Sequence, residues 1–264
     1  MKQTKHKKRD LREFFGIRDA VCLVLCCALT LVCFAAVSGF SGSTVQDILS
    51  ENALDVNSDV QNPDITVVLD PGHGGIDGGA VGVGGVFEKD LNLDIALMLR
   101  DMLVFSGYRV VMTREDDSMY YDESSSLSKK AQDTRRRVDM TRDCENCIFV
   151  SIHMNKFVSE KYSGLQVYYS QNVEGGRELA QGIQTCAREL LQSDNNRKIK
   201  KADATIYVLD KAVVPAVLVE CGFLSNAAET ERLCDKEYRR DLATVLFIAI
   251  DGYFSSGGEG EAQN

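Results

Sequence analysis

Short apolar runs separated by amphipathic stretches make up the chain from residue 65 onward. Six of these runs have the length and apolar content of strands, and they cover residues 65–69, 108–112, 148–152, 164–169, 204–209 and 216–219. Between the first two runs, apolar residues recur at the spacing of one helix face, and Gly107 stands just past the end of that helix. Similar spacing predicts helices over residues 175–192 and 238–254. A strand, a helix and a strand in that order predict parallel pairing.

This pattern predicts an α/β fold over residues 65–255: a three-layer domain with a mostly parallel twisted sheet and helices on both faces. The run at 164–169 alternates most regularly, which suits an edge or antiparallel position. Residues 118–137 are polar and charged, and we expect a surface loop that leads into a short helix. Residues 256–264 are expected to be a disordered tail.

The first 64 residues have a different pattern. A basic tail, residues 1–19, precedes an apolar segment, residues 20–40, and an acidic, aperiodic linker, residues 41–64. The apolar length lies between that of a secretory signal, about 7 to 15 residues, and that of a membrane span, about 18 or more. We favour an uncleaved anchor, while a cleaved signal peptide stays open. The basic flank would stay in the cytosol, so we expect the domain outside the cell membrane, or secreted if the segment is cleaved.

The formal net charge of −9 conceals a split between the two ends of the chain. The first 43 residues carry seven basic and three acidic side chains, which leaves the remainder near −13. Such an acidic domain excludes nucleic acid as an expected partner. Four of the nine cysteines lie in the apolar segment. Cys144 and Cys147 have the spacing of a metal or redox pair, but no second pair completes a four-ligand site, so a local disulfide is the stronger alternative.

Three apolar runs lead directly into polar motifs. Residues 67–69 run into Asp-Pro-Gly-His-Gly-Gly at 70–75, residues 149–152 into His-Met-Asn at 153–155, and residues 217–219 into Glu-Cys-Gly at 220–222. Parallel strands would bring these motifs to one edge of the sheet, where open α/β sheets form ligand sites. The chain has three histidines, and two of them, His73 and His153, stand in these motifs.

Two histidines at one sheet edge suggest a zinc site. A catalytic zinc needs three protein ligands and an open position, and two histidines with one glutamate form a known set. Glu88 is the third candidate, because it follows a glycine-rich loop and precedes a helix that starts near Asp90. The alternative is that Glu88 only complements the positive end of that helix, an effect of about 0.3 to 1 kcal/mol.

Glu220 is the candidate catalytic residue. A carboxylate that ends so apolar a run costs several kcal/mol unless it has a partner or a proton. It could take a proton from an attacking water and return it to a leaving amine. The alternative is a structural ion pair with an arginine such as Arg114. The glycines at 72–85 match no nucleotide-binding spacing, and no His-Glu-x-x-His helix occurs.

Four segments, at 69–75, 88–93, 151–155 and 219–226, resemble in order and spacing the zinc-dependent N-acetylmuramoyl-L-alanine amidases of the amidase-3 family. The resemblance runs from about residue 65 to 254. It implies that His73, Glu88 and His153 bind Zn²⁺ and that Glu220 is catalytic. The implied substrate is peptidoglycan, cut between the lactyl group of N-acetylmuramic acid and L-alanine.

Two departures from the family pattern concern the positioning of the substrate and the control of activity. Residues 137–141 stand where members often carry an arginine-rich helix that ends in Ala-Asn, and the long insertion of members with an inhibitory helix is absent from the sequence. Control is therefore expected from expression or from an activator protein. The short length and amino-terminal anchor look similar to the spore-cortex branch, which acts in germination. Two alternatives stay open: another zinc hydrolase of wall material, or an inactive amidase-like activator module.

Overall fold

The computed structural model describes residues 65–142, 144 and 146–257. The basic tail, the apolar segment and the linker predicted over residues 1–64 lie outside the described residues, as does most of the predicted tail at 256–264.

Six strands form one sheet in the order β2-β1-β3-β6-β4-β5. Their bounds are β1 Thr66–Pro71, β2 Arg109–Met112, β3 Cys147–Asn155, β4 Gln166–Tyr169, β5 Lys200–Lys201 and β6 Ala216–Phe223. β1 pairs in parallel with β2 and β3, and β3 pairs in parallel with β6. β4 runs antiparallel to β6 and parallel to β5. The mostly parallel sheet and the antiparallel position of residues 164–169 are thus confirmed.

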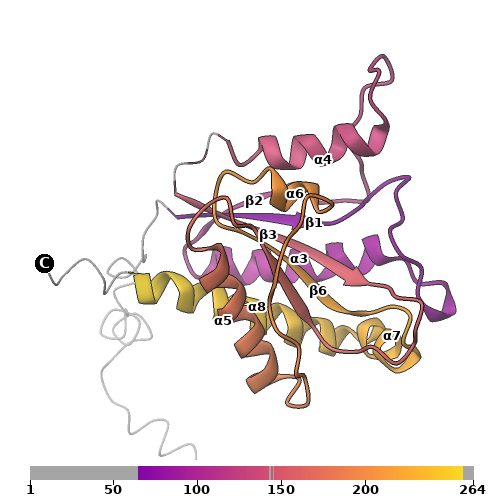
Figure 1. Cartoon of the computed structure of the whole chain (residues 1–264), viewed down its shortest axis with the longest axis vertical. Helices are drawn as coiled ribbons and strands as arrows, with labels where there is room; N and C mark the ends of the chain where they lie inside the picture. Colours follow the sequence, from indigo (N-terminus) through magenta and orange to yellow (C-terminus); the bar gives the residue numbers. More distant parts are fainter. Residues whose placement is uncertain (1–64, 143, 145, 258–264) are drawn as a thin grey trace, which may run out of the picture. The chain divides into compact units, whose positions relative to one another are not determined.

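Helices cover both faces of this sheet (Figure 1). The helices are η2 Val83–Gly85, a 3-10 turn, α3 Glu88–Phe105, α4 Lys129–Asp139, α5 Gly176–Leu190, α6 Tyr207–Asp210, α7 Ala227–Cys234 and α8 Lys236–Gly257. The larger core lies between the sheet and α3, α5 and α8, while α4 and α6 pack on a smaller core across the sheet. No helix in the described part of the chain is both long and apolar enough to cross a membrane. The predicted three-layer α/β architecture is confirmed.

The two cores explain the unbroken apolar runs of the central strands. Along β6, Val217 and Val219 pack in the larger core, whereas Leu218 between them packs in the smaller one. Because successive side chains of a strand point to opposite faces, a strand buried on both faces is apolar at most positions until it reaches the carboxyl edge of the sheet. The first polar residue after such a run therefore lies at a sheet edge.

The strand predicted over residues 204–209 is wrong. The strand in this region is the two-residue β5, and the following chain forms α6. The Oδ1 atom of Asp203 accepts a hydrogen bond from the backbone N–H of Thr205 at 2.8 Å, which turns the chain away from the sheet. Val208 and Leu209 then reach the smaller core from a helical turn. α7 was not predicted, and its signal is Asn226, whose side chain accepts from the N–H of Glu229 at 3.1 Å as an N-cap.

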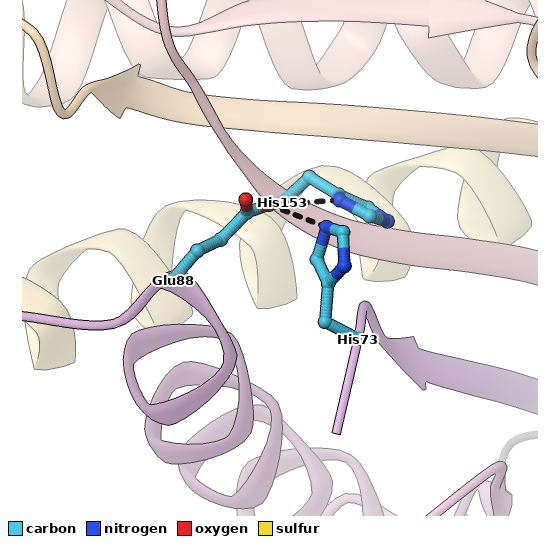
Figure 2. A group of neighbouring side chains, drawn as sticks. All are labelled: His73, Glu88 and His153. Atoms are coloured by element: carbon cyan, nitrogen blue, oxygen red, sulfur yellow. Dashed lines mark hydrogen bonds and ion pairs between the residues drawn. The ribbon is translucent and has the colours of Figure 1, made fainter. Parts of the chain in front are cut away.

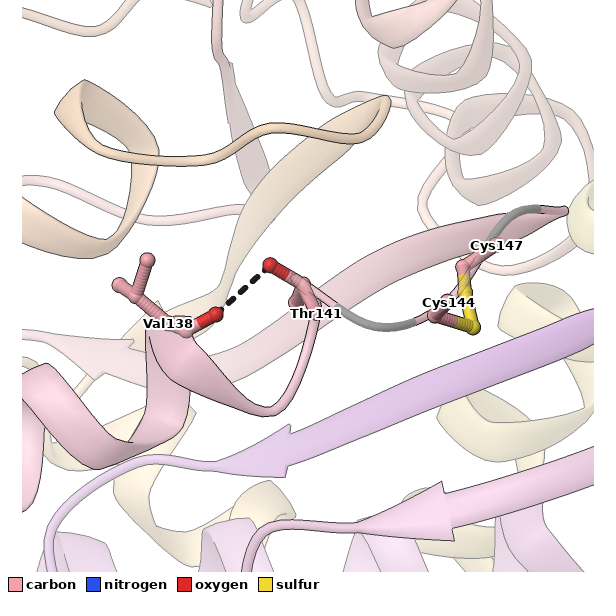
Figure 3. Close-up of a disulfide and its surroundings, with 4 residues drawn as sticks. All are labelled: Val138, Thr141, Cys144 and Cys147. Carbon is pink, nitrogen blue, oxygen red and sulfur yellow. Dashed lines mark hydrogen bonds between the residues drawn. A yellow bond between two sulfur atoms is a disulfide. The ribbon is translucent and has the colours of Figure 1, made fainter.

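A disulfide joins Cys144 to Cys147 where the chain enters β3 (Figure 3). α4 ends just before it, and the Thr141 hydroxyl donates to the carbonyl of Val138 at 2.7 Å. The pair therefore links cysteines in the α4–β3 connection, in agreement with the disulfide alternative. It lies at the start of β3, whereas His153 lies near the other end of that strand.

Candidate metal centre and active site

His73, Glu88 and His153 converge at the carboxyl edge of the sheet (Figure 2). His73 follows β1, His153 lies near the end of β3, and Glu88 is the first residue of α3. One ligand atom from each side chain lies within 4.8 Å of the other two. Two imidazoles and one carboxylate at this separation suit the donor set of a catalytic zinc.

The Glu88 carboxylate connects the two histidines. Its Oε1 atom lies 2.9 Å from Nδ1 of His153 and 3.3 Å from Nε2 of His73. Backbone groups fix its orientation, because the N–H of Met154 donates to Oε1 at 3.0 Å and the N–H of Ala80 donates to Oε2 at 2.7 Å. Glu88 thus reaches beyond its own helix, and complementing the helix end does not account for these contacts.

Electrostatics link these groups as well. Burial alone would raise the pKa of Glu88, but hydrogen bonds and charge from His153 and His73 outweigh it and hold that pKa far below its usual range. Burial would lower the pKa of His73, yet Glu88 and Asp77 together raise it. Nδ1 of His73 lies 2.9 Å from Oδ2 of Asp77, without the geometry of a hydrogen bond. The carboxylates of Glu88 and Asp77 thus place negative charge beside the two imidazoles, and this charge would also attract a metal cation.

Two glycines allow the site to close. A Cβ atom on Gly72 would lie 2.2 Å from the ring of His153, and one on Gly79 would lie 2.6 Å from Oε2 of Glu88. Gly79 also has a positive φ of 67°, and His73 itself has a φ of 63°. The glycine-rich loop therefore lets the backbone approach the three side chains closely.

Glu220 lies beside this group on β6, in register with His153 on β3. Its Oε2 atom is buried and has no hydrogen-bond partner. Burial, and next the negative charge of Glu88, raise the pKa of Glu220 to about 7, although the two histidines act in the opposite direction. A carboxylate with this pKa can both accept and release a proton near neutral pH.

The predicted alternative for Glu220, an ion pair with Arg114, is wrong. Arg114 donates instead to the carbonyls of Pro71 at 2.9 Å, Gly72 at 3.1 Å and Lys89 at 2.8 Å. These carbonyls belong to the turn before His73 and to the start of α3. Arg114 therefore ties together the two segments that carry His73 and Glu88.

A second buried arginine, Arg137 of α4, holds the same turn. It donates to the carbonyls of Pro71 at 2.9 Å and His73 at 2.7 Å and pairs with the carboxylate of Asp70 at 2.5 Å. Sequence reasoning missed this support. The signal was present in the motif, because an aspartate directly after the apolar run at 67–69 needs a partner, and arginines in residues 114–137 offered one.

We expect Asp70→Asn to destabilise the fold by about 2 kcal/mol at pH 7, because it removes one of the two carboxylates that pair with the buried Arg137 and leaves only Asp133. Burial would raise the pKa of Asp70, but Arg137 and the hydroxyls of Ser151 and Thr113 outweigh it and lower that pKa. A carboxyl with a depressed pKa adds stability above its unfolded pKa and loses it as pH falls through the folded one. Urea unfolding between pH 7 and 2 should therefore show a smaller acid-side loss in Asp70→Asn than in the wild type.

Asp139→Asn is the matched control, since Asp139 is the last residue of the helix that carries Arg137 and forms an exposed pair with Arg142 just beyond it. Its loss should stay below about 1 kcal/mol. Equal losses in the two variants would contradict a supporting role for the Asp70–Arg137 pair.

Comparison with known proteins bears on the fold and the activity. The Amidase_3 family model, described as N-acetylmuramoyl-L-alanine amidase, matches residues 67–251. The germination-specific N-acetylmuramoyl-L-alanine amidase of Bacillus subtilis strain 168 is 37% identical over 195 residues, which cover 73% of this chain and 81% of that protein. LytC, an N-acetylmuramoyl-L-alanine amidase of the same organism, is 30% identical over 75% of this chain and 38% of its own length.

Solved structures of related proteins have the same fold. The CwlD amidase from Clostridioides difficile, in complex with the GerS lipoprotein, is 39% identical and superposes with a TM-score of 0.69 over 72% of this chain and 98% of its own. The N-acetylmuramoyl-L-alanine amidase AmiC2 of Nostoc punctiforme is 32% identical, with a TM-score of 0.63 over 73% of this chain and 98% of its own.

Proposed function

Because this chain belongs to the Amidase_3 family of N-acetylmuramoyl-L-alanine amidases, we propose that it cleaves peptidoglycan with one zinc ion held by His73, Glu88 and His153 and with Glu220 as the proton carrier. The bond that the enzyme hydrolyses joins the lactyl group of N-acetylmuramic acid to L-alanine. Water adds to the carbonyl carbon, the C–N bond breaks, and the products are a free lactyl carboxyl group and the amino group of L-alanine.

The convergence of the three side chains carries the zinc proposal. Their ligand atoms lie within 4.8 Å of one another, and the donors are two imidazoles and a carboxylate whose depressed pKa keeps it ionised. A bound zinc would polarise the scissile carbonyl and help to activate water. The backbone N–H groups of Ala80 and Met154 hold the Glu88 carboxylate in place, so the protein needs little rearrangement to bind the ion.

Glu220 supplies proton transfer in this proposal. Its unpartnered Oε2 atom lies on the strand next to His153, and burial raises its pKa in the metal-free protein, which suits a group that takes a proton from the attacking water and returns it to the leaving amine. A buried carboxylate without a hydrogen bond costs stability, which favours a role in the reaction rather than in the fold.

The biological setting is also part of the proposal. The basic and apolar patterns of residues 1–40 favour a membrane anchor with the enzyme outside the cell membrane. The 37% identity to a germination-specific amidase supports spore cortex as the wall substrate. The related CwlD amidase, whose structure was solved in complex with the GerS lipoprotein, supports an activator lipoprotein as a partner.

Digestion of intact peptidoglycan tests the activity and its setting together. The full-length enzyme, purified in detergent and supplied with zinc, should release new L-alanine amino termini and leave the glycan acetylated. Analysis of the fragments from vegetative wall and from spore cortex would show which substrate is cut faster. Loss of acetyl groups, or new termini within the peptide, would contradict the amidase assignment, and faster cleavage of vegetative wall would contradict the cortex proposal.

A further inference from the structure

A cavity of about 340 Å³ opens beside β4, and its charge is opposite to that of the acidic domain. Lys161, Arg197 and Arg232 line it, and Asp194 is the one carboxylate among the lining residues. The other lining groups are uncharged, and most of them are polar. A cationic hollow on an acidic domain suits a small anionic group better than a broad anionic surface.

Arg197 is the most strongly oriented of these cations. Its Nε atom donates to the carbonyl of Ser163 at 2.6 Å and its Nη1 atom donates to Oε1 of Gln166 at 3.2 Å. The guanidinium also stacks 4.4 Å from the centre of the Phe223 ring. These contacts hold the guanidinium plane in one orientation.

The charge of Arg197 is nevertheless unmatched. Within the described part of the chain, no carboxylate forms an ion pair with Arg197 or Lys161, whereas Arg232 pairs with Glu229 at 3.0 Å. The Nη2 atom of Arg197 makes no hydrogen bond to any described residue. A fixed, half-buried guanidinium with free N–H groups is suited to bind a carboxylate.

Arg197 connects the cavity to the strands that carry the active-site residues. Glu220 is paired with His153 on one side and with Gln166 on the other, so the three side chains lie in one row on one face of the sheet. Arg197 continues that row through its hydrogen bond to Gln166. If the side chains of Glu220 and Gln166 run parallel, one strand spacing plus one hydrogen bond places the Glu220 carboxylate within roughly 8 Å of Nη1 of Arg197. This is close to the span of two extended residues, roughly 7 Å.

We propose that Arg197, assisted by Lys161, binds a carboxylate on the second residue of the peptidoglycan stem peptide and so orients the peptide for cleavage. The inference rests on the amidase activity, because the peptide must extend from the scissile amide beside Glu220 toward the cavity. Stem peptides carry this carboxyl group either free or as an amide. The site would therefore favour the free acid.

Two synthetic substrates test this proposal: disaccharide stem peptides with a free α-carboxylate or a carboxamide on the second residue. The full-length enzyme should prefer the free acid about tenfold in kcat/KM, mainly through KM, as expected for a hydrogen bond to a charged group. Arg197→Gln should cut both substrates at nearly equal kcat/KM. Arg197→Lys should retain part of the preference.

Arg188→Gln is the control, because Arg188 is exposed on α5 and pairs with its neighbour Glu189. It should keep the full preference. If Arg197 only braces Phe223 and Ser163, Arg197→Gln will lower the melting temperature and slow both substrates equally, and the tenfold ratio will persist. That outcome overturns the proposal, as does a wild type without preference. Failure of the wild type to cut either substrate would instead contradict the amidase activity.

Discussion

Replacing Glu220 by glutamine should lower kcat at least about 100-fold, the range typical of a lost general acid–base group. Glutamine keeps the shape of the side chain but cannot take a proton from water or return one to the leaving amine. Because the three metal-binding candidates remain, the variant should still bind zinc stoichiometrically. Elemental analysis of the purified protein, together with the release of L-alanine amino termini from peptidoglycan, measures both effects.

The fold should not suffer from this change. Oε2 of Glu220 is buried without a hydrogen-bond partner, so removal of the charge should leave the melting temperature unchanged or raise it in the metal-free protein. Glu231→Gln makes the same chemical change at an exposed position of α7 and should behave like the wild type. A Glu220→Gln enzyme that keeps more than a tenth of the wild-type kcat would mean that Glu220 is only structural.

Glu88→Gln is expected to weaken zinc binding by more than about 100-fold, since even partners of metal ligands contribute 10- to 100-fold. The amide is a poor zinc ligand and leaves two imidazoles without the carboxylate that contacts both. Dialysis against a chelator of graded concentration, followed by measurement of bound zinc, gives the affinity. Activity should fall in parallel and should recover in part at high zinc concentration.

Asp90→Asn is the control that separates the loss of zinc binding from the loss of a favourable charge at the amino end of α3. Glu88 and Asp90 are the two acidic residues in the first turn of α3, but Asp90 is exposed and is not among the clustered metal-ligand candidates. If Glu88 served only the positive end of the helix, both variants would lose about 0.3 to 1 kcal/mol of stability and neither would lose zinc. Stoichiometric zinc in Glu88→Gln after dialysis would remove Glu88 from the proposed site.

The pattern of apolar and polar residues was enough to predict the layers of the domain and the edge of the sheet at which the candidate site lies. Strands buried on both faces are apolar at most positions, so the charged or imidazole side chain that follows each run marks the carboxyl edge of the sheet. His73, His153 and Glu220 could be placed there for this reason. Glu88 could be predicted from its position between a glycine-rich loop and the start of a helix.

Other features depended on contacts between segments far apart in the chain. Arg114 and Arg137 donate to backbone carbonyls of Pro71, of His73 and of the start of α3, and backbone acceptors cannot be identified from a sequence pattern. The strand predicted over residues 204–209 became α6 because the local hydrogen bond to Asp203 and the burial of Val208 and Leu209 favoured a helical turn. An apolar run this short fits both the strand pattern and the helix pattern, and only its packing in the fold distinguishes the two.

The cationic cavity is the clearest case of a feature that depends on the tertiary structure. Arg197 carries no motif that sequence reasoning used, and it lies 23 residues before Glu220 in the chain. Antiparallel pairing of β4 with β6 places Gln166 beside Glu220, and the fold then brings Arg197 onto Gln166. Local patterns specify which residues are buried, but strand order and register, set by the packing of the whole domain, decide which side chains become neighbours.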